Sequence, residues 1–250
     1  KEFTKSFAFR MKTDSEKKLT RNTGFYERTS KLTRNFVDAR GFWLPNDYTK
    51  HGVINEYTAC REKAVVIDLS SLRKFEILGP DAEELMNYTL TRNIKKLSVG
   101  QIVYSAMCYE NGTMFDDGTL LKLSETGFRW VCGDEYAGEW LKEQAKKKNF
   151  KVLIKNSTDQ INNISVQGPN SRKILEKIIF TPPTQPTVSE LQWFRFTICR
   201  LEELNGIPLI VSRTGYTGEL GYEVWCHPDH APKVWDKVME AGKEDGLIPA

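Results

Sequence analysis

Two short apolar runs near the C-terminal end of the sequence constrain the fold more than any other feature. Pro208–Val211 and Tyr222–Cys226 flank a loop with glycines at positions 215, 218 and 221. The pattern predicts two strands joined by a bent connection, because glycine permits positive φ and close approach of the backbone. Glu223 and Trp225 then share the face of the second strand opposite its apolar residues. That face is either turned to solvent or forms a ligand wall in which the carboxylate is a directional acceptor.

Size and composition restrict the class of protein. The 250 residues suffice to bury a core in one large domain or two. The hydrophobic share of 40% and the charged share of 28% are typical of a soluble globular protein. No apolar run approaches the ~18–20 residues of a membrane span. The net charge of +3 is too small to indicate nucleic-acid binding. We therefore expect neither a membrane nor a nucleic acid as a partner.

The cysteines indicate a reducing compartment. There are five cysteines, dispersed along the chain without a CxxC pair, and only three histidines. Such a set favours free thiols in the cytoplasm, with the mitochondrial matrix as an alternative, and argues against a disulfide framework or a zinc site. We expect no metal ligands. Cys108 and Cys226 lie in apolar runs and are interpreted as small core residues.

Strand and helix patterns alternate along the chain. The basic segment 1–35 is interpreted as a solvated arm or a lid laid over the domain. Helical spacing is predicted over 54–64, 80–86, 135–148, 171–178 and 231–242, and strands over 65–69, 75–79, 101–108, 118–123, 128–132, 150–154 and 164–167. Hairpin-length connections are more common than long crossovers. This favours an α+β fold over a doubly wound parallel sheet.

The glycine loop resembles the signature of the folate-binding aminomethyltransferase family, which includes the T-protein of the glycine cleavage system. The resemblance rests first on Ser212-Arg-Thr-Gly-Tyr-Thr-Gly-Glu219 and the following Gly221-Tyr-Glu223. Further matches, in the family's order, are Val66–Ser70, Gly79–Ala82, Tyr104-Ser105, Glu110–Gly112, Asp116-Asp117 and Gln167–Pro169. The similarity covers nearly everything after about residue 40, and a run this long is specific, unlike a lone glycine pattern.

This resemblance implies a particular organisation of the α+β fold. The family has two intertwined, mixed antiparallel α+β domains around a central folate cavity. One domain would be discontinuous and comprise 1–73 plus 158–250, and a ferredoxin-like domain, 74–157, would be inserted into it. A C-terminal β-barrel-like domain of the family would follow Ala250. We therefore expect the sequence to be a piece of a longer protein.

A pterin ring accounts for the residue types that match the family. Its 2-amino-4-oxopyrimidine edge presents two adjacent N–H donors, which a carboxylate accepts in a bidentate, charge-assisted pair. The resemblance assigns this role to Glu223 and places Tyr104 and Tyr216 near the folate as aromatic walls. Either tyrosine is alternatively a half-buried residue with a satisfied hydroxyl. Leu72 borders the cavity where the family has methionine. Arg213 either stabilises the loop or contacts the second substrate.

The resemblance implies a second functional acid, about 100 residues before Glu223 in the sequence. Asp116 and Asp117 begin a strand after a turn, and because successive strand residues face opposite ways, at most one lines the cavity. The resemblance selects Asp117 as the catalytic acid–base residue. Transfer of a one-carbon unit to tetrahydrofolate, the co-substrate, makes a folate nitrogen shed a proton that an aspartate within reach accepts. Asp116 is left to cap the turn.

Three functions follow from the resemblance. The first is a tetrahydrofolate-dependent aminomethyltransferase that releases ammonia and forms methylenetetrahydrofolate, with a lipoyl carrier protein as donor. The second is a tetrahydrofolate-dependent demethylase of a small methylated amine or sulfonium compound. The third is a non-catalytic, folate-binding regulatory protein of the same fold. Asp117 together with Glu223 favours an enzyme. The family's Asp-Val-Ser-His-Met-Gly is Asp68-Leu-Ser-Ser-Leu-Arg73 here, a change on the presumed donor side.

Overall fold

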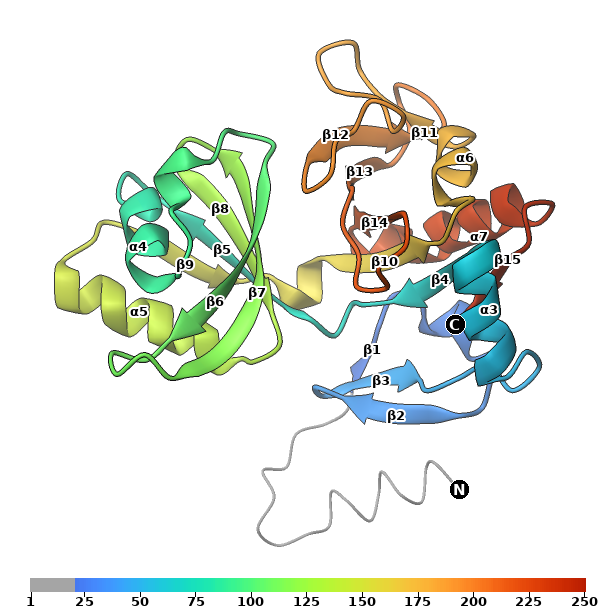
Figure 1. The fold of residues 1–250 in the computed structure, drawn as a ribbon, viewed down its shortest axis with the longest axis horizontal. Coiled ribbons are helices and arrows are strands. Elements are labelled where there is room, and N and C mark those ends of the chain that lie inside the picture. The colour runs from blue at the N-terminus through green and yellow to red at the C-terminus, as the bar shows by residue number, and fades with distance from the viewer. Residues whose placement is uncertain (1–20) are drawn as a thin grey trace, which may run out of the picture. The chain divides into compact units, whose positions relative to one another are not determined.

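The computed structural model describes residues 21–250, which form two compact units (Figure 1). The first unit comprises the described residues up to Ser71 together with Asn162–Leu191 and Thr197–Ala250. The second comprises Leu72–Ile161 and Gln192–Phe196. The domain limits implied by the family resemblance stay a prediction. The expectation for the basic segment lies outside the described residues where it concerns 1–20.

The first unit is built on a seven-stranded sheet. Its strand order is β11-β12-β13-β14-β10-β4-β15. In chain order the strands are β4 (Ala64–Asp68), β10 (Asn162–Gln167), β11 (Ile179–Phe180), β12 (Phe196–Leu201), β13 (Pro208–Ser212), β14 (Gly221–Cys226) and β15 (Leu247–Pro249). Antiparallel pairs join β10 to both β4 and β14, and β15 runs parallel to β4. The two strands predicted around the glycine loop are therefore confirmed as the antiparallel neighbours β13 and β14.

Helices lie on both faces of this sheet. On one face α6 (Ser171–Glu176) and α7 (Ala231–Gly242) bury their apolar side chains with Val66, Ile164 and Val224 in a common core. On the other face α3 (Val53–Glu62) packs Ala59 and Cys60 against Val65. The bounds predicted for α7 are confirmed. The spacing that indicated α3 runs through Ile54 and Tyr57, yet these side chains are 77% and 62% exposed. The helix instead buries the face that carries Glu56, Ala59 and Cys60.

Residues 21–35 are not a solvated arm. The segment holds β1 (Arg21–Asn22) and α2 (Tyr26–Thr29), and Phe25 is completely buried in the core of the first unit. The Thr23 hydroxyl donates to Asp68 Oδ2 at 2.6 Å, and the Gly24 N–H donates to Asn162 Oδ1 at 2.6 Å. β1 also joins β3 (Phe42–Pro45) and β2 (Phe36–Ala39) in a three-stranded sheet. A single buried phenylalanine leaves no periodic signal, which is why the sequence pattern misleads here.

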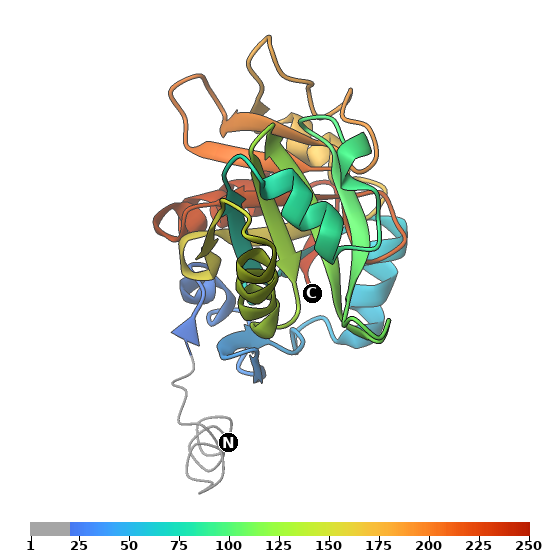
Figure 2. The same ribbon diagram turned by 90° about the vertical axis from the view of Figure 1, so that its left-hand side faces the viewer.

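The second unit is an antiparallel sheet covered by two helices. Its strand order is β6-β7-β8-β5-β9, all neighbours antiparallel. The strands are β5 (Arg73–Leu78), β6 (Ile102–Cys108), β7 (Met114–Ser124), β8 (Gly127–Cys132) and β9 (Leu153–Asn156), and the helices are α4 (Ala82–Thr89) and α5 (Tyr136–Lys148). Figure 2 shows α4 and α5 on the same face of the sheet. Trp140, Leu141 and Ala145 of α5 point into the core, as predicted.

Two strands begin three or more residues away from the predicted start, and the other strand bounds differ by at most two residues. β7 begins at Met114, four residues earlier than the apolar pattern indicated, because Asp116 and Asp117 interrupt that pattern but still pair with β6. β9 begins at Leu153 instead of 150, because Asn149 ends α5 with φ 56° and Phe150 packs into the core. Short 3-10 turns, η1 (Ile94–Lys96), η2 (Thr158–Gln160) and η3 (Pro228–His230), complete the elements. Each helix within 21–250 is too short or too polar to cross a bilayer.

Candidate functional site

The strand that follows the glycine loop carries a buried polar face. Tyr222, Val224 and Cys226 point into the hydrophobic core, as the alternation predicts. On the opposite face Glu223 is half-buried and Trp225 is 3% exposed, with its indole N–H donating to Ser212 Oγ at 3.1 Å. The solvent-face interpretation of this pair is therefore wrong. The burial is that expected of a wall built from an acid and an aromatic ring.

The neighbouring strand β10 extends this face. Ile164 and Val166 join the core, whereas Asn163, Ser165 and Gln167 alternate with them and are almost completely buried. Ser165 lies directly opposite Glu223 in the antiparallel register. Three consecutive buried polar side chains on one strand face are unusual, because an unpaired polar group in an apolar interior costs roughly 1–3 kcal/mol. Sequence reasoning did not find this row as a site; Gln167 was noted only as part of a motif match.

Asn163 orients the carboxylate of Glu223. Its Nδ2 donates to Glu223 Oε2 at 3.4 Å, and this contact fixes the amide orientation, because a flipped amide would face the carboxylate with its own oxygen. The other end of the amide, Oδ1, is buried and accepts no hydrogen bond from the described residues. Buried acceptors without donors are rare in folded proteins. The site thus holds a carboxylate and, beside it, the buried Asn163 Oδ1 as an acceptor without a donor among residues 21–250.

The loop between β13 and β14 is anchored at several points. Arg213 Nη1 donates to the Leu191 carbonyl at 3.2 Å. Of the two roles considered for Arg213, this contact supports stabilisation of the loop. Arg61 on α3 pairs with Glu219 at 2.5 Å. Between these anchors Tyr216 is 99% exposed, so the alternative of a half-buried tyrosine with a satisfied hydroxyl is wrong for this position. The loop therefore presents an aromatic ring from an anchored backbone.

In the second unit the two adjacent aspartates are separated as the strand alternation predicts. The Tyr104 hydroxyl on β6 donates to Asp117 Oδ2 on β7, and the two residues are diagonal neighbours on one face of the sheet. Asp116 points the other way, and its oxygens accept from the backbone N–H groups of Asp117 at 2.9 Å and Asp134 at 3.0 Å. Asp116 is thus a structural residue. Asp117 is the aspartate with an exposed aromatic partner.

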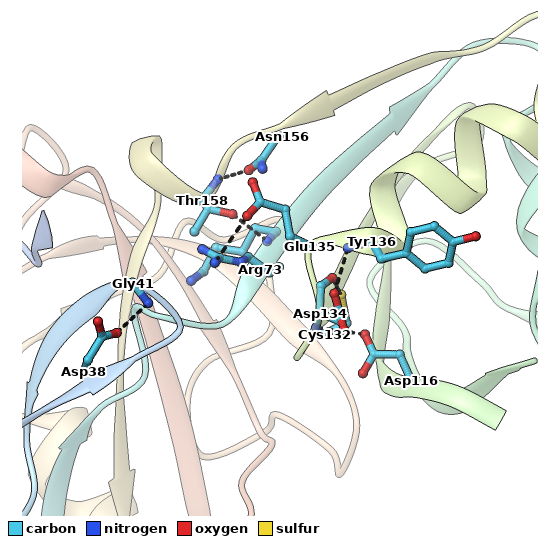
Figure 3. Close-up of polar contacts among 11 residues, drawn as sticks. Asp38, Gly41, Arg73, Asp116, Cys132, Asp134, Glu135, Tyr136, Asn156 and Thr158 are labelled. Atoms are coloured by element: carbon cyan, nitrogen blue, oxygen red, sulfur yellow. Dashed lines mark hydrogen bonds and ion pairs between the residues drawn. The ribbon is translucent and has the colours of Figure 1, made fainter. Parts of the chain in front are cut away.

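Figure 3 shows the polar cluster that surrounds Asp134. Asp134 Oδ1 accepts the Tyr136 N–H at 2.8 Å at the start of α5, and the Cys132 thiol lies 3.5 Å from the Asp134 carbonyl. Burial raises the pKa of the Cys132 thiol far above its ordinary value, and the negative charge of Asp116 adds to this. Arg73, which stands where the family has glycine, pairs with Glu135 at 3.5 Å. This ion pair lies at the first residue of β5, an interior strand of the sheet.

Leu72 is half-buried where the chain enters the second unit. Its carbonyl accepts a hydrogen bond at 2.8 Å from the ammonium of Lys74, a side chain that is completely buried. Fully buried lysines are rare unless they are paired. Sequence reasoning did not single out Lys74, because one lysine in a strand pattern carries no special signal.

The predicted site residues form two groups, each held within one unit. Glu223, Tyr216 and Arg213 belong to the first unit, whereas Asp117 and Tyr104 belong to the second, together with Leu72. Their joint action on one ligand stays a prediction. The chemistry of the first group fits a folate, since the unused acceptor of Asn163 next to the Glu223 carboxylate matches an edge rich in N–H donors. Within 21–250, no group of three or more His, Cys, Asp or Glu side chains is placed to hold a metal ion.

Two curated relatives match most of this chain. The chain is 53% identical to "Trimethylamine-oxide aldolase" of Ruegeria pomeroyi over 247 residues, 99% of this chain and 31% of the relative. It is 35% identical to "Aminomethyltransferase" of Alkaliphilus metalliredigens over 216 residues, 85% of this chain and 56% of the relative. The chain thus spans about a third to just over half of the length of these two curated relatives.

A solved structure has the same fold. The glycine cleavage system aminomethyltransferase T of Bartonella henselae superposes with a TM-score of 0.77 at 24% identity, over 92% of this chain and 59% of that chain. The predicted mixed α+β fold is confirmed by this likeness. The model of the family described as "GCVT N-terminal domain" matches residues 25–250, and the chain therefore belongs to that family.

Proposed function

We propose that this chain binds tetrahydrofolate and takes part in the transfer of a one-carbon unit to it. The observation that carries the proposal is the buried polar face around Glu223, where the carboxylate is oriented by Asn163 and flanked by Trp225. Acids are placed in such surroundings at a cost in desolvation, which a charged, bidentate contact with a ligand offsets. Membership of the family supports the same ligand.

The first group of residues would bind and orient the pterin. Glu223 would accept its two adjacent N–H donors, and Asn163 Oδ1 offers a further acceptor beside them. Tyr216, which the anchored loop presents to solvent, would cover the flat ring. A rigid set of acceptors fixes the orientation of the ligand, and correct orientation alone supplies a large part of the rate of a transfer reaction.

Asp117 would act as the general base. Tetrahydrofolate supplies a nucleophilic nitrogen that receives the one-carbon unit. Asp117 would accept the proton that this nitrogen sheds, while the Tyr104 hydroxyl, which donates to its Oδ2, holds the carboxylate in one orientation. Asp116 is assigned a structural role instead, because each of its oxygens accepts a backbone N–H group.

The one-carbon donor is the finer part of the proposal. We propose a small methylated amine or amine oxide ahead of the aminomethyl group of a lipoyl carrier protein. The 53% identity to a trimethylamine-oxide aldolase and the altered segment Ser71–Arg73 support this order. An amine oxide needs no external oxidant, since cleavage of its N–O bond raises a methyl carbon to the methylene level. The balanced products would be the secondary amine, methylenetetrahydrofolate and water.

A binding and turnover experiment tests the proposal. Isothermal titration of the full chain with tetrahydrofolate is expected to give saturable binding. Turnover is then measured with trimethylamine oxide, dimethylglycine, sarcosine, free formaldehyde and an aminomethylated lipoyl carrier protein, with methylenetetrahydrofolate and methyltetrahydrofolate quantified separately. Absence of tetrahydrofolate binding refutes the proposal. Binding without turnover from any of the donors would favour the non-catalytic alternative.

The series of donors distinguishes the aminomethyltransferase from the enzyme that acts on a small methylated amine or amine oxide. Methylenetetrahydrofolate formed only from the lipoyl-bound group, together with ammonia, would restore the aminomethyltransferase as the function. Product from an amine oxide or from formaldehyde, above the rate without protein, supports the order proposed here. A further reaction contains the trimethylamine-oxide aldolase of Ruegeria pomeroyi in addition to this chain. If trimethylamine oxide reacts only in that mixture, cleavage of the amine oxide belongs to the part of the relative that this chain does not match.

A further inference from the structure

The side chain of Gln167 fills the inside of the glycine loop. Its Nε2 donates to Ser165 Oγ at 2.7 Å and to the Thr214 carbonyl at 3.1 Å, and its Oε1 accepts from the Thr217 hydroxyl at 2.9 Å. The residue is completely buried. One amide therefore connects strand β10 to the loop at two positions, Thr214 and Thr217.

Two glycines of the loop pack directly against this amide. A Cβ at Gly215 would lie 2.1 Å from Gln167 Oε1, and a Cβ at Gly221 would lie 2.0 Å from the same atom. Neither position has a positive φ angle, so backbone conformation does not require glycine there. Gly218 differs, since it has φ 78° and open space around its Cβ position. Close contact with Gln167 is thus the physical reason for glycine at 215 and 221.

The amide also determines where functional side chains are presented. Thr214 and Thr217, which it holds, flank Tyr216 at the loop tip, and Gly221 begins the strand that carries Glu223 two residues later. A completely exposed tyrosine has few contacts of its own to order it. Its position is set by the backbone on either side, and hence by Gln167.

We propose that Gln167 is a positioning residue for folate binding, which holds the loop 214–221 in its binding conformation before the ligand arrives. This inference rests on the proposed function for its ligand but not for the loop contacts. A loop ordered in advance costs less entropy to bind with, so the amide contributes to affinity through preorganisation. The chemistry of the transfer step does not involve Gln167.

The test compares Gln167→Met with a matched control. Methionine has a similar volume but makes none of the three hydrogen bonds. The control is Gln144→Met, because Gln144 is also buried, lies on α5 of the second unit, and has an amide without partners among the described residues. Loss of hydrogen bonds from a buried network predicts a Kd for tetrahydrofolate raised about 10–100-fold in Gln167→Met. The control should bind as the unaltered chain does.

Two readouts separate positioning from a merely structural role. The turnover number at saturating tetrahydrofolate should change less than about 3-fold, so the loss appears in Kd and KM and not in kcat. Hydrogen exchange of residues 214–221 without ligand should become faster in Gln167→Met and stay unchanged in Gln144→Met. Should Gln167→Met not fold, Thr217→Val removes one of the same hydrogen bonds and is expected to raise Kd about 3–10-fold.

The outcomes assign failure to one idea or the other. Unchanged Kd and unchanged loop exchange in a folded Gln167→Met overturn the positioning role. Faster loop exchange in a chain that does not bind tetrahydrofolate at all supports the loop contacts and refutes the proposed function. Non-additive effects of Gln167→Met and Thr217→Val on Kd show that both act through one contact. Additive effects, in contrast, contradict the inference.

Discussion

The side-chain amide of Asn163 donates to the carboxylate of Glu223 at 3.4 Å across two neighbouring strands, while Asn163 Oδ1 stays buried without a donor among the described residues. The relationship explains why a carboxylate is tolerated next to the 3% exposed Trp225. The contact orients the carboxylate, and the proposed function assigns it to the pterin. Our first prediction concerns this carboxylate.

Glu223→Gln should bind tetrahydrofolate about 10–100-fold more weakly, because a hydrogen bond to a charged group contributes about 1.5–3 kcal/mol. Glutamine keeps the shape but replaces one acceptor oxygen with a donor, which faces the N–H groups of the pterin. Titration calorimetry measures the effect. The matched control is Glu176→Gln, an exposed glutamate on α6 of the same unit, which should bind normally. Equal affinities for both variants would remove Glu223 from the site.

The two adjacent aspartates should give opposite phenotypes. Asp117→Asn is expected to lower turnover by a factor of about 10²–10⁴, the usual contribution of a general base, with tetrahydrofolate binding retained. Asp116→Asn should retain turnover and lower the melting temperature, since Asp116 accepts two backbone N–H groups. Activity assays and thermal unfolding of both variants check the pair. Normal turnover in Asp117→Asn would show that this carboxylate is not the base.

Gly221→Ala should be destabilised and should be rescued in part by a second substitution. The new methyl group overlaps the Gln167 amide, which is held by hydrogen bonds and cannot move freely. Gln167→Ala removes the obstacle, so the double variant should lose less unfolding free energy than the sum of the single variants, by about 1–3 kcal/mol. Urea unfolding of the three variants measures this coupling. If the losses of unfolding free energy were strictly additive, the methyl group introduced at position 221 would not overlap the Gln167 side chain.

Acid should selectively weaken the contact of Asp245 with α6. Hydrogen bonds from Lys173 and then Lys177 lower the pKa of the Asp245 carboxyl below its ordinary value of 3.8. Because the folded pKa is the lower one, the stabilisation is present above about pH 4 and is lost as the pH falls through the folded pKa. The stability difference between the unaltered chain and Asp245→Asn should therefore shrink below pH 4. The comparison variant is Asp229→Asn, the same chemical change at an 82% exposed side chain.

Thiol alkylation should distinguish one cysteine from the others. Burial raises the pKa of the Cys199 and Cys226 thiols to about 12, and raises those of Cys60 and Cys132 as well. Cys108 is only half-buried, and all five thiols are free. Since the thiolate is the reactive form, iodoacetamide at pH 8 should modify Cys108 first in the folded chain and all five after unfolding. Mass spectrometry of the modified peptides shows the order, and early labelling of Cys226 would contradict the burial of β14.

Local patterns were sufficient wherever a residue's environment depends on its near neighbours in the chain. Alternation along 222–226 predicted which side chains of β14 enter the core, and the spacing of Val234, Trp235 and Val238 predicted α7 with its correct bounds. Alternation also separated Asp116 from Asp117. In each case the period of the element, two for a strand and 3.6 for a helix, decides the direction of the side chain.

The sequence by itself thus determined the α+β class, the strand pair around the glycine loop and the family resemblance. Only the tertiary structure decided that Phe25 is a core residue, that Ile54 and Tyr57 face solvent, and that the β10 side chains build the polar face. The reason is the distance along the chain between partners. Gln167 meets Thr214 and Thr217 from 47 and 50 residues away, and Asn163 meets Glu223 from 60 residues away. No periodicity spans such separations, so these contacts exist only once the sheet has aligned its strands.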